Sequence, residues 1–442
     1  MALIIRELIG SLPEMKTKRE RLIILLVAVA VSLIGYSSLI YVPQYYRGLA
    51  YATSDEKASS VEMELVAANT RFAINIFKEL VTEDDGKNIF ISPFSISTAL
   101  TMIYNGAEDS TKEAMAETLG FNNMGLGKIN QDYLNLLESL EKADKQVSLE
   151  IGNSVWMDKE FEPRVYPTFT ETISTYYKGD IYARNFESTD TVEDVNGWIS
   201  DKTNGKIDRM VEDIDPEIVM FLINAIYFKG DWATKFDESR TSEGDFFLSD
   251  GSIVRPDIMY SSGEFSYNSG GNFKAARLPY GRDKIAMYIF LPSEGVSLGS
   301  FIISLNLTAF DDYVGRLRPV SDLKVKLPKF KLEYGTKRLN SALTKLGMGV
   351  TFDMYSANFN GIAPVDQGNL YIDFVDHKAF IEVNEQGTEA AGATVVGVAV
   401  ESEPQETTFY VNRPFFFVIR DDRSGSILFM GKIENPLEMH SP

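Results

Sequence analysis

Hydrophobic residues recur at spacings of three and four positions through much of the first half of the chain. The segment from Val61 to Val81 repeats in this way, which predicts an amphipathic helix with one buried face. Comparable patterns predict helices at Ser110–Leu119, Leu126–Ala143 and Val192–Lys202, the last on the surface. Gly120 follows the first of these three and suits a left-handed residue that ends a helix.

A further helix is predicted where residues 88–106 read NIFISPFSISTALTMIYNG. Ser92 can cap it, with Pro93 in the first turn, where a missing N–H costs nothing. Apolar side chains occupy nearly all faces of this helix. It is therefore predicted to be buried.

Strand patterns interleave with these helices and dominate the second half of the chain. The predicted strands are Val147–Trp156, Ile218–Phe228, Phe246–Leu248, Lys274–Leu278, Ile285–Leu291, Leu323–Leu327, Leu370–Val383, Phe415–Arg420 and Ile427–Ile433. Helices mixed with many strands, several of them in sequential hairpins, predict an α+β fold with large antiparallel sheets. No linker-like stretch interrupts this region, so residues 59–437 are predicted to form one domain.

The N-terminus has a different pattern. Residues 22–42 carry no charge, and their number matches the ~20 residues that a helix needs to cross a bilayer. Four basic residues lie just before this run and tyrosines cluster at its far end. By the positive-inside rule, this arrangement keeps the preceding residues in the cytosol and sends the rest of the chain outside.

We therefore expect residues 1–21 to be a cytosolic segment and residues 22–42 a single-pass transmembrane signal anchor. Residues 43–58 would be a tether and residues 438–442 a C-terminal tail. The domain would then lie outside the cytosol at the cell membrane. The alternative is secretion after cleavage of a signal peptide, whose apolar core would be shorter, at ~7–15 residues.

Composition narrows the function. The 442-residue chain has a formal net charge of −20, which argues against nucleic acid as a partner because a phosphate-binding surface needs a basic stripe. It contains no cysteine, so disulfides, thiolate nucleophiles and cysteine-bound metals are excluded. Its two histidines, His377 and His440, are too few to favour a zinc site. We expect no metal and no cofactor.

Motifs of catalysis are also missing from the sequence. There is no phosphate-cradling glycine loop, no G-x-S-x-G and no H-E-x-x-H, and so the chain is not expected to be an enzyme. His377 stands between Asp376 and Lys378 in an apolar strand pattern. A buried hydrogen-bonding role suits it better than that of a catalytic base, whereas His440 is expected to be exposed in the tail.

Five separated motifs together resemble one family. They read NIFISPFSISTALTMIYNGA at 88–107, FLINAIYFKGDW at 221–232, DHKAFIEVNEQGTEAAGAT at 376–394, RPFFFVIRD at 413–421 and GSILFMGKIENP at 425–436. In order and spacing they resemble the serpins, over roughly residues 59–437. With the expected anchor, the chain looks like a membrane-anchored, prokaryotic-type member.

The resemblance implies a fold of three sheets and eight or nine helices, with an exposed reactive-centre loop at about residues 386–408. An inhibitory serpin offers this loop as bait to a serine or cysteine protease, which forms an acyl-enzyme. The cut loop then inserts into the main sheet as a new strand and drags the protease to the far end, where deacylation stalls. Serpin loop insertion is itself a standard example of strand addition.

Small side chains in the loop suit such insertion. The resemblance marks a hinge and insertion segment, which comprises Glu385, Gly387, Thr388, Glu389, Ala390, Ala391, Gly392, Ala393 and Thr394. Successive strand residues face opposite sides, and every second residue from Thr388 to Val398 is small or β-branched. Gly387 is expected to permit the bend where the loop leaves the strand. The alternative is a mobile loop that never inserts.

Supporting residues follow from the resemblance by position. Ser92, Ser95, Asn224 and His377 match the family's shutter, a polar cluster under the centre of the main sheet. Trp232 matches the tryptophan of the breach, the top of that sheet where insertion starts. For Trp232, plain core packing is the other interpretation, and both can be true.

The scissile bond implied by counting from Glu385 is Glu401-Ser402. The loop is about two residues longer than in well-known members, so a shift to Glu403 stays open. A Glu at this position suits a protease with a basic specificity pocket. Cleavage next to Ala399 or Val400 would instead suit an elastase-like pocket. We therefore expect a covalent protease complex in which Glu or a small aliphatic residue precedes the cut.

Two other functions remain open. A non-inhibitory serpin could act as a binding or scaffolding module at the cell surface, although such members usually carry proline or bulky charged residues in the hinge, and this chain does not. A hydrolase or transferase with an unrecognised site has no motif to support it.

Overall fold

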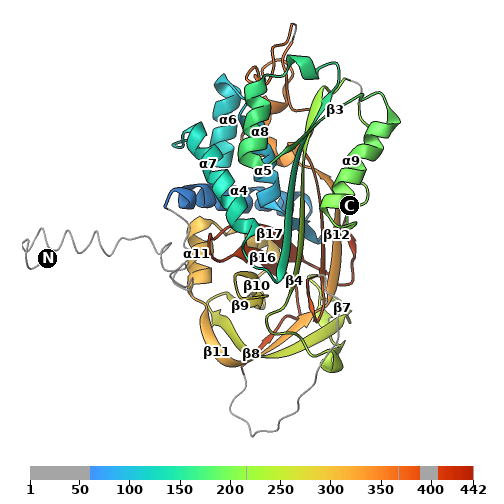
Figure 1. The fold of residues 1–442 in the computed structure, drawn as a ribbon. Helices are drawn as coiled ribbons and strands as arrows, with labels where there is room; N and C mark the ends of the chain where they lie inside the picture. Colours follow the sequence, from blue (N-terminus) through green and yellow to red (C-terminus); the bar gives the residue numbers. More distant parts are fainter. Residues whose placement is uncertain (1–59, 216, 367, 389–406, 442) are drawn as a thin grey trace, which may run out of the picture. The chain divides into compact units, whose positions relative to one another are not determined.

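The computed structural model describes residues 60–215, 217–366, 368–388 and 407–441 (Figure 1). The expected transmembrane segment, residues 22–42, and the tether lie outside these residues, as do loop residues 389–406. Among the described residues, no helix combines the length and the apolar character that crossing a bilayer requires. All described residues belong to one unit.

Nine α-helices form within the described residues. They are α4 (Ser60–Glu83), α5 (Pro93–Tyr104), α6 (Asp109–Leu119), α7 (Leu126–Glu141), α8 (Pro167–Tyr177), α9 (Thr189–Lys202), α10 (Leu298–Ile303), α11 (Leu307–Gly315) and α12 (Asn340–Lys345). The side chain of Ser92 caps α5 by accepting a hydrogen bond from the Ser95 N–H, and α5 is buried, as predicted. Gly120 ends α6 with φ of 79°, a left-handed conformation that glycine adopts without strain.

The described strands form three sheets, which agrees with the expected α+β fold. A nine-stranded sheet has the order β1-β17-β16-β10-β9-β8-β11-β15, with β5 paired to β8. Its strands are β1 (Ile89–Ile91), β5 (Ser242–Glu243), β8 (Asp257–Gly270), β9 (Phe273–Tyr280), β10 (Ile285–Pro292), β11 (Arg318–Pro328), β15 (Thr408–Tyr410), β16 (Phe415–Asp421) and β17 (Ile427–Ile433). A two-stranded sheet pairs β6 (Phe246–Phe247) with β7 (Ile253–Val254).

The seven-stranded sheet contains the candidate functional site. Its order is β18-β12-β13-β14-β4-β2-β3. The strands are β2 (Val147–Asp158), β3 (Asp180–Arg184), β4 (Met220–Asp231), β12 (Phe330–Arg338), β13 (Asp376–Val383), β14 (Gly387–Thr388) and β18 (His440–Ser441). The expected C-terminal tail thus contributes a short edge strand, which pairs with β12.

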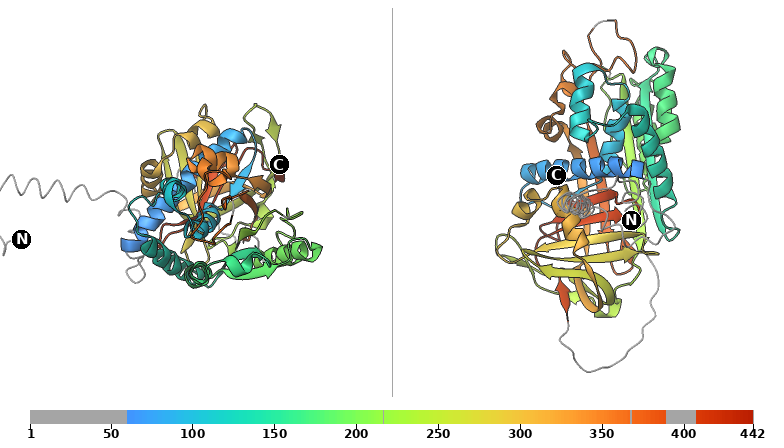
Figure 2. Two further views of the ribbon diagram at one scale, coloured as in Figure 1. Left: turned by 90° about the horizontal axis from the view of Figure 1, so that it is seen from above. Right: turned by 90° about the vertical axis from the view of Figure 1, so that its left-hand side faces the viewer.

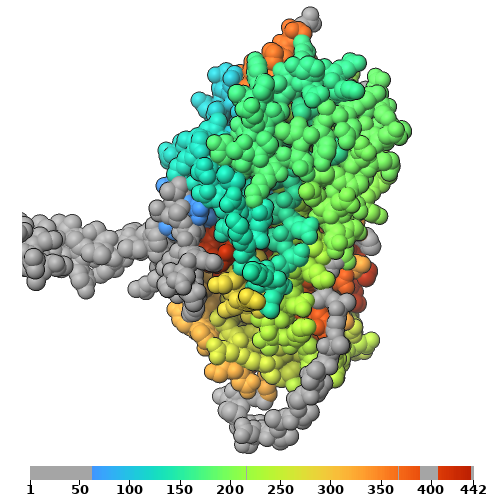
Figure 3. Space-filling view, in the orientation of Figure 1, coloured from blue at the N-terminus to red at the C-terminus, as the bar shows by residue number. Residues whose placement is uncertain are grey.

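Helices pack on both faces of the seven-stranded sheet. The inner face contacts α5, which lies between β4 of this sheet and β17 of the nine-stranded sheet. Figure 2 shows α4, in blue, crossing above the red C-terminal strands. On the outer face, α9 buries Val195, Trp198 and Ile199 against β2 and β4 in a second apolar cluster. The space-filling view shows this green part of the chain on the molecular surface (Figure 3), so α9 is a surface helix, as predicted, with one buried face.

The predicted strand Leu370–Val383 is too long by six residues. Regular pairing begins only at Asp376, which is opposite Arg338 at the end of β12. Beyond Arg338 the neighbouring chain turns into α12. Residues 370–375 therefore have a strand-like sequence but no strand beside them among the described residues.

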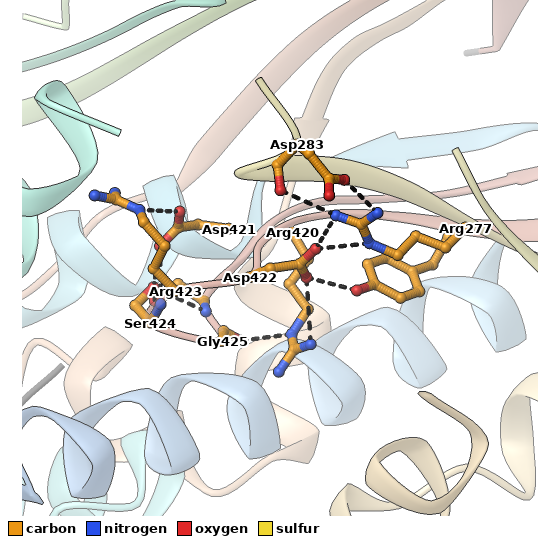
Figure 4. Close-up of polar contacts among 10 residues, drawn as sticks. Arg277, Asp283, Arg420, Asp421, Asp422, Arg423, Ser424 and Gly425 are labelled. Carbon is orange, nitrogen blue, oxygen red and sulfur yellow. Dashed lines mark hydrogen bonds and ion pairs between the residues drawn. The ribbon is translucent and has the colours of Figure 1, made fainter. Parts of the chain in front are cut away.

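A dense polar region lies at the turn between β16 and β17. We call residues 420–425 the hairpin turn (Figure 4). The carboxylate of Asp422 accepts hydrogen bonds from Arg277 Nε (2.8 Å) and from the Tyr288 hydroxyl (2.5 Å). Asp421, fully buried, accepts from Arg423 Nε (3.0 Å) and from both the N–H and the hydroxyl of Ser424. These contacts fix the turn against the neighbouring strands.

Candidate functional site

The seven-stranded sheet has an incomplete row of pairing at its centre. Among the described residues, β4 and β13 make no ladder with each other, and only the two residues of β14 lie between them. Thr388 pairs with Gly230 of β4 and with Val383 of β13, and Gly387 pairs with Asp231 of β4. We call this boundary between β4 and β13 the seam. It already holds two residues from the start of the loop, Gly387 and Thr388.

A cavity of about 20 Å³ continues the seam directly beyond Thr388. It is lined by residues 226–228 of β4, residues 380–382 of β13 and Thr388. Thr203, Lys206 and Ile207, which follow α9, cover it from the outer face. The seam therefore opens where the next loop residues would continue the strand.

The turn that leads into β14 is tightly held. The N–H groups of Gln386 and Gly387 donate to the side-chain oxygen of Asn384, at 3.0 and 3.3 Å. Glu385 accepts from Thr241 (2.8 Å) and forms an ion pair with Lys329 (3.2 Å). Burial alone would raise the pKa of Glu385, but these hydrogen bonds and the positive charge of Lys329 lower it below its ordinary value.

Gly387 is required here for a reason other than the expected bend. It lies in extended backbone within β14, and the turn is made by residues 384–386. A Cβ at position 387 would overlap the carbonyl oxygen of Gly230 and lie 2.6 Å from the Cα of Asp231. Close approach of the two strands, not a left-handed conformation, therefore excludes a larger residue.

Trp232 adjoins β14 at the end of β4. Its indole Nε1 donates to the Asn384 carbonyl (2.9 Å), and its backbone N–H donates to the Gln386 carbonyl (2.8 Å). Its ring stacks on Tyr280 at 4.4 Å between centroids. The sequence interpretation placed Trp232 where insertion starts, and in the structure it contacts the first loop residues while also being core-packed.

Tyr280 of β9 was not found from the sequence. Its hydroxyl lies 2.7 Å from Thr388 Oγ1, so Thr388 faces the interior between the two large sheets. Burial raises the pKa of Tyr280, which keeps the hydroxyl neutral and able to donate or accept. A single tyrosine at the end of an apolar strand gives no sequence signal for this role.

The four expected shutter residues lie together below this point. His377 of β13 is buried, and its Nε2 accepts a hydrogen bond from the Ser92 N–H at 3.1 Å. Ser95 Oγ donates to Asn224 of β4, on the side-chain oxygen and on the carbonyl. The N-terminus of α5 thus bridges the seam from the inner face. Asn224 also donates to Asn153 of β2, a partner that the sequence did not reveal.

His377 is a neutral acceptor in this cluster. Burial lowers its pKa to about 4, so the imidazole is uncharged near neutral pH and its unprotonated Nε2 can accept from Ser92. This agrees with the interpretation of His377 as a buried hydrogen-bonding group. Within the described residues, no group of histidine and acidic side chains could hold a metal ion.

The expected hinge residues Glu389–Thr394 and the expected bond Glu401-Ser402 lie outside the described residues. They stay predictions, as do the roles assigned to the shutter, to Glu385 and to Trp232. The structure does describe the two ends of the loop. It leaves β14 in the seam and returns at β15, which pairs in parallel with β11.

Comparisons with known proteins agree with this geometry. The family model Serpin (serine protease inhibitor) matches residues 67–436. The chain is 31% identical to an uncharacterized serpin-like protein of Methanosarcina acetivorans, over 87% of this chain and 91% of that protein. It is 33% identical to a leukocyte elastase inhibitor of Xenopus laevis, over 84% and 99%. The native state of tengpin, a thermophilic serpin, superposes with a TM-score of 0.76 at 32% identity, over 87% and 96%.

Proposed function

The chain belongs to the serpin family, and we propose that it is a suicide-substrate inhibitor of serine proteases or of cysteine proteases. Serpins are protease inhibitors rather than enzymes, which agrees with the absence of catalytic motifs. In the proposed mechanism the protease attacks the loop, forms an acyl-enzyme and is trapped when the cut loop inserts into the seam. The observation that carries the proposal is β14, which is paired to both walls of a seam that has no other pairing within the part of the chain that the structure describes.

The register of β14 defines where the rest of the loop would go. Thr388 lies opposite Gly230 and Val383, and β14 is antiparallel to both walls. Each further loop residue would then meet the preceding residue of β4 and of β13. Six steps on, Thr394 would lie between Asn224 and His377, the two polar residues that face each other across the seam.

Alternation decides which side chains are buried on insertion. Thr388 faces the interior through its contact with Tyr280. The other residues of the same parity up to Val398 would share this inner face, and all of them are small or β-branched. The alternate residues, beginning with Glu389, would face the outer side, where the segment after α9 covers the cavity. The loop residues that would face the interior are therefore small enough to be buried between the two large sheets.

Insertion would release much free energy. A new strand of ~15 residues gains hydrogen bonds at both edges, at ~1 kcal/mol net each, together with some apolar burial. The total is on the order of 10–20 kcal/mol, which is comparable with the stability of a whole domain. The uncut chain must then be kinetically trapped. Insertion would have to part the α5 contacts that link the two walls of the seam.

We also propose the finer features that the sequence predicts. The scissile bond is Glu401-Ser402, with cleavage next to Glu403, Ala399 or Val400 as the alternatives. The target prefers Glu or a small aliphatic residue before the cut. Residues 22–42 anchor the chain in the cell membrane, with the serpin domain outside the cytosol.

The proposal is tested with the purified full-length chain and a panel that includes a glutamate-specific serine endopeptidase, an elastase and a papain-like cysteine protease. An inhibitor forms a covalent complex that survives boiling in detergent, and mass spectrometry of the released peptide identifies the bond that was cut. If every protease cleaves the loop and none is retained, the inhibitor function is wrong. The non-inhibitory binding module is then the remaining function.

A further inference from the structure

The side chain of Gln386, in the turn before β14, lies between two opposite charges. Its Oε1 accepts a hydrogen bond from Lys235 Nζ at 2.7 Å, and its Nε2 donates to Glu238 Oε1 at 2.6 Å. Gln386 is buried, whereas Lys235 and Glu238 are exposed. Both ends of the buried amide are therefore held by charged partners. We call these contacts between Gln386, Lys235 and Glu238 the clasp.

The two charges of the clasp belong to the β4 side of the seam. They lie on residues 232–241, which follow directly after β4. Lys235 also forms an ion pair with Asp231, the last residue of β4, at 3.7 Å. Glu238 begins the short 3-10 helix η3 (Glu238–Arg240). The ammonium and the carboxylate therefore have defined positions relative to β4.

The turn that carries Gln386 is attached to both walls of the seam. It continues the chain from the end of β13 at Val383, so one wall holds it covalently. The β4 side holds it by hydrogen bonds, because the N–H of Trp232 donates to the Gln386 carbonyl (2.8 Å) and the N–H of Phe236 donates to the Glu385 carbonyl (3.0 Å). The clasp adds two charge-assisted bonds to this second attachment. Together they keep β14 beside β4.

The residue type at position 386 matches the two charges. A side-chain amide has an acceptor oxygen for an ammonium and N–H donors for a carboxylate. A glutamate would still accept from Lys235, but it would place a second negative charge against Glu238. A lysine would meet Lys235 with a like charge. Of these side chains, only the amide satisfies both partners.

We propose that Gln386 is a positioning residue for loop insertion, which acts by keeping β14 in the seam through the clasp. This inference rests on the proposed inhibitory function and concerns its efficiency. In that mechanism an acylated protease is either trapped by insertion or released when water hydrolyses the acyl bond, and the faster step decides. A strand whose first pairs are already formed does not have to pay the entropy of closing the loop onto the seam. The clasp therefore favours trapping.

The test compares the full-length chain with Gln386→Glu, with Glu238→Gln and with the double variant. The double variant moves the amide to position 238, where it can donate to the carboxylate introduced at position 386, so the clasp is restored with donor and acceptor exchanged. Glu238→Gln alone is the control, because an amide oxygen can still accept from Gln386. The probe is whichever of the glutamate-specific endopeptidase and the elastase forms a complex with the unsubstituted chain.

Three quantities are measured for each protein: the amount of chain consumed for each protease molecule inhibited, the second-order rate at which the loop is cut, and the hydrogen exchange of the Thr388 amide. We expect Gln386→Glu to consume at least threefold more chain while the rate of cutting stays within twofold, and the Thr388 amide to exchange faster. The control and the double variant should consume within about 1.5-fold of the normal amount.

Unchanged consumption or unchanged Thr388 exchange in Gln386→Glu overturns this inference and leaves the inhibitory function intact. A double variant that consumes as much chain as Gln386→Glu also overturns it, because the effect would then not arise from the clasp. Absence of any complex between the unsubstituted chain and either protease overturns both the inference and the inhibitory function.

Discussion

The seam and the hairpin turn both contain buried polar groups, but the two regions differ in how many hydrogen bonds each group makes. In the hairpin turn, Asp421 and Asp422 are saturated by arginine, tyrosine and serine donors from the turn and from β9 and β10 (Figure 4). In the seam, β4 and β13 are joined through a few single hydrogen bonds to the N-terminus of α5. Buried networks of the first kind fix one structure. The few hydrogen bonds between α5 and the walls of the seam can be replaced by the hydrogen bonds of an inserted strand.

This contrast predicts that changes in the seam affect inhibition, whereas changes in the hairpin turn affect stability alone. The largest effect is expected for Thr388→Arg. Thr388 is buried against Tyr280, and an unpaired guanidinium cannot be buried there cheaply. We expect the variant to become a substrate, so that at least tenfold more chain is consumed for each protease molecule inhibited. Titration of protease activity measures this stoichiometry.

The matched control for that experiment is Glu389→Arg. It introduces the same side chain one residue further on, which would face the outer side of the sheet. It should inhibit with a stoichiometry within about threefold of the unsubstituted chain. Stoichiometric inhibition by Thr388→Arg would show that this face is not buried on insertion.

The hairpin turn should show the reverse behaviour. Asp421→Asn removes the charge that compensates the buried guanidinium of Arg423, and breaking such a pair costs about 3–5 kcal/mol. Denaturant unfolding should report this loss, while the folded fraction should still inhibit normally. Asp250→Asn is the control, because the exposed Asp250 makes the same two hydrogen bonds to Ser252 that Asp421 makes to Ser424. Its stability should change much less, and an equal loss would contradict the contrast.

The shutter should make stability depend on pH through His377. Its pKa is about 4 in the folded chain and ~6.5 when unfolded. As the pH falls from 6.5 to 4, the unfolded chain gains this proton and the folded chain does not. The stabilisation present above pH 6.5 is therefore lost, by roughly 3 kcal/mol at pH 4.

Substitution of His377 isolates this contribution. The difference in unfolding free energy between the unsubstituted chain and His377→Gln should shrink steadily from pH 7 to pH 4. Replacing the other histidine, as His440→Gln, should leave the pH dependence unchanged. A difference that stays constant across this range would mean that His377 is not buried as a neutral acceptor.

A smaller effect is expected for Gly387→Ala. The added Cβ would meet the backbone of Gly230 and Asp231, and such overpacking costs about 1–3 kcal/mol. We expect β14 to be expelled, so that hydrogen exchange of the Thr388 amide becomes faster. Gly299→Ala, at a position of α10 with free space around it, should not lower stability, because alanine favours a helix more than glycine does, and should leave the exchange of the Thr388 amide unchanged. If Gly387→Ala behaves like this control, β14 does not occupy the seam in solution.

Much of the fold could be predicted from local signals. The Ser92 cap, Gly120 and the apolar strands of the C-terminal half are encoded by nearby residues, and the structure confirms them. The strand β8 was missed because its sequence, rich in serine and glycine, lacks a run of apolar residues. Residues 370–375 were predicted as a strand because periodicity reports what a segment can form. Periodicity does not show whether a second strand lies beside the segment to pair with it.

The candidate site was predicted less completely. The family resemblance identified Ser92, Ser95, Asn224 and His377, and the structure shows how α5 joins them. Tyr280, Asn153 and Gly230 were missed because their contacts to the seam are made across the fold, between residues far apart in the sequence. Gly387 was identified for the wrong reason, since only the paired strand reveals the close approach of the Gly230 carbonyl.

The central claim is that the loop can become a strand of the seam. The most direct test is the melting temperature of the full-length chain before and after a single cut in the loop by a protease that is not retained. A gain on the order of 10–20 kcal/mol should raise the melting temperature by roughly 10–25 °C in a domain of this size. The same cut in Thr388→Arg should produce a much smaller rise. An unchanged melting temperature after complete cleavage of the unsubstituted chain would contradict insertion and favour the non-inhibitory binding module.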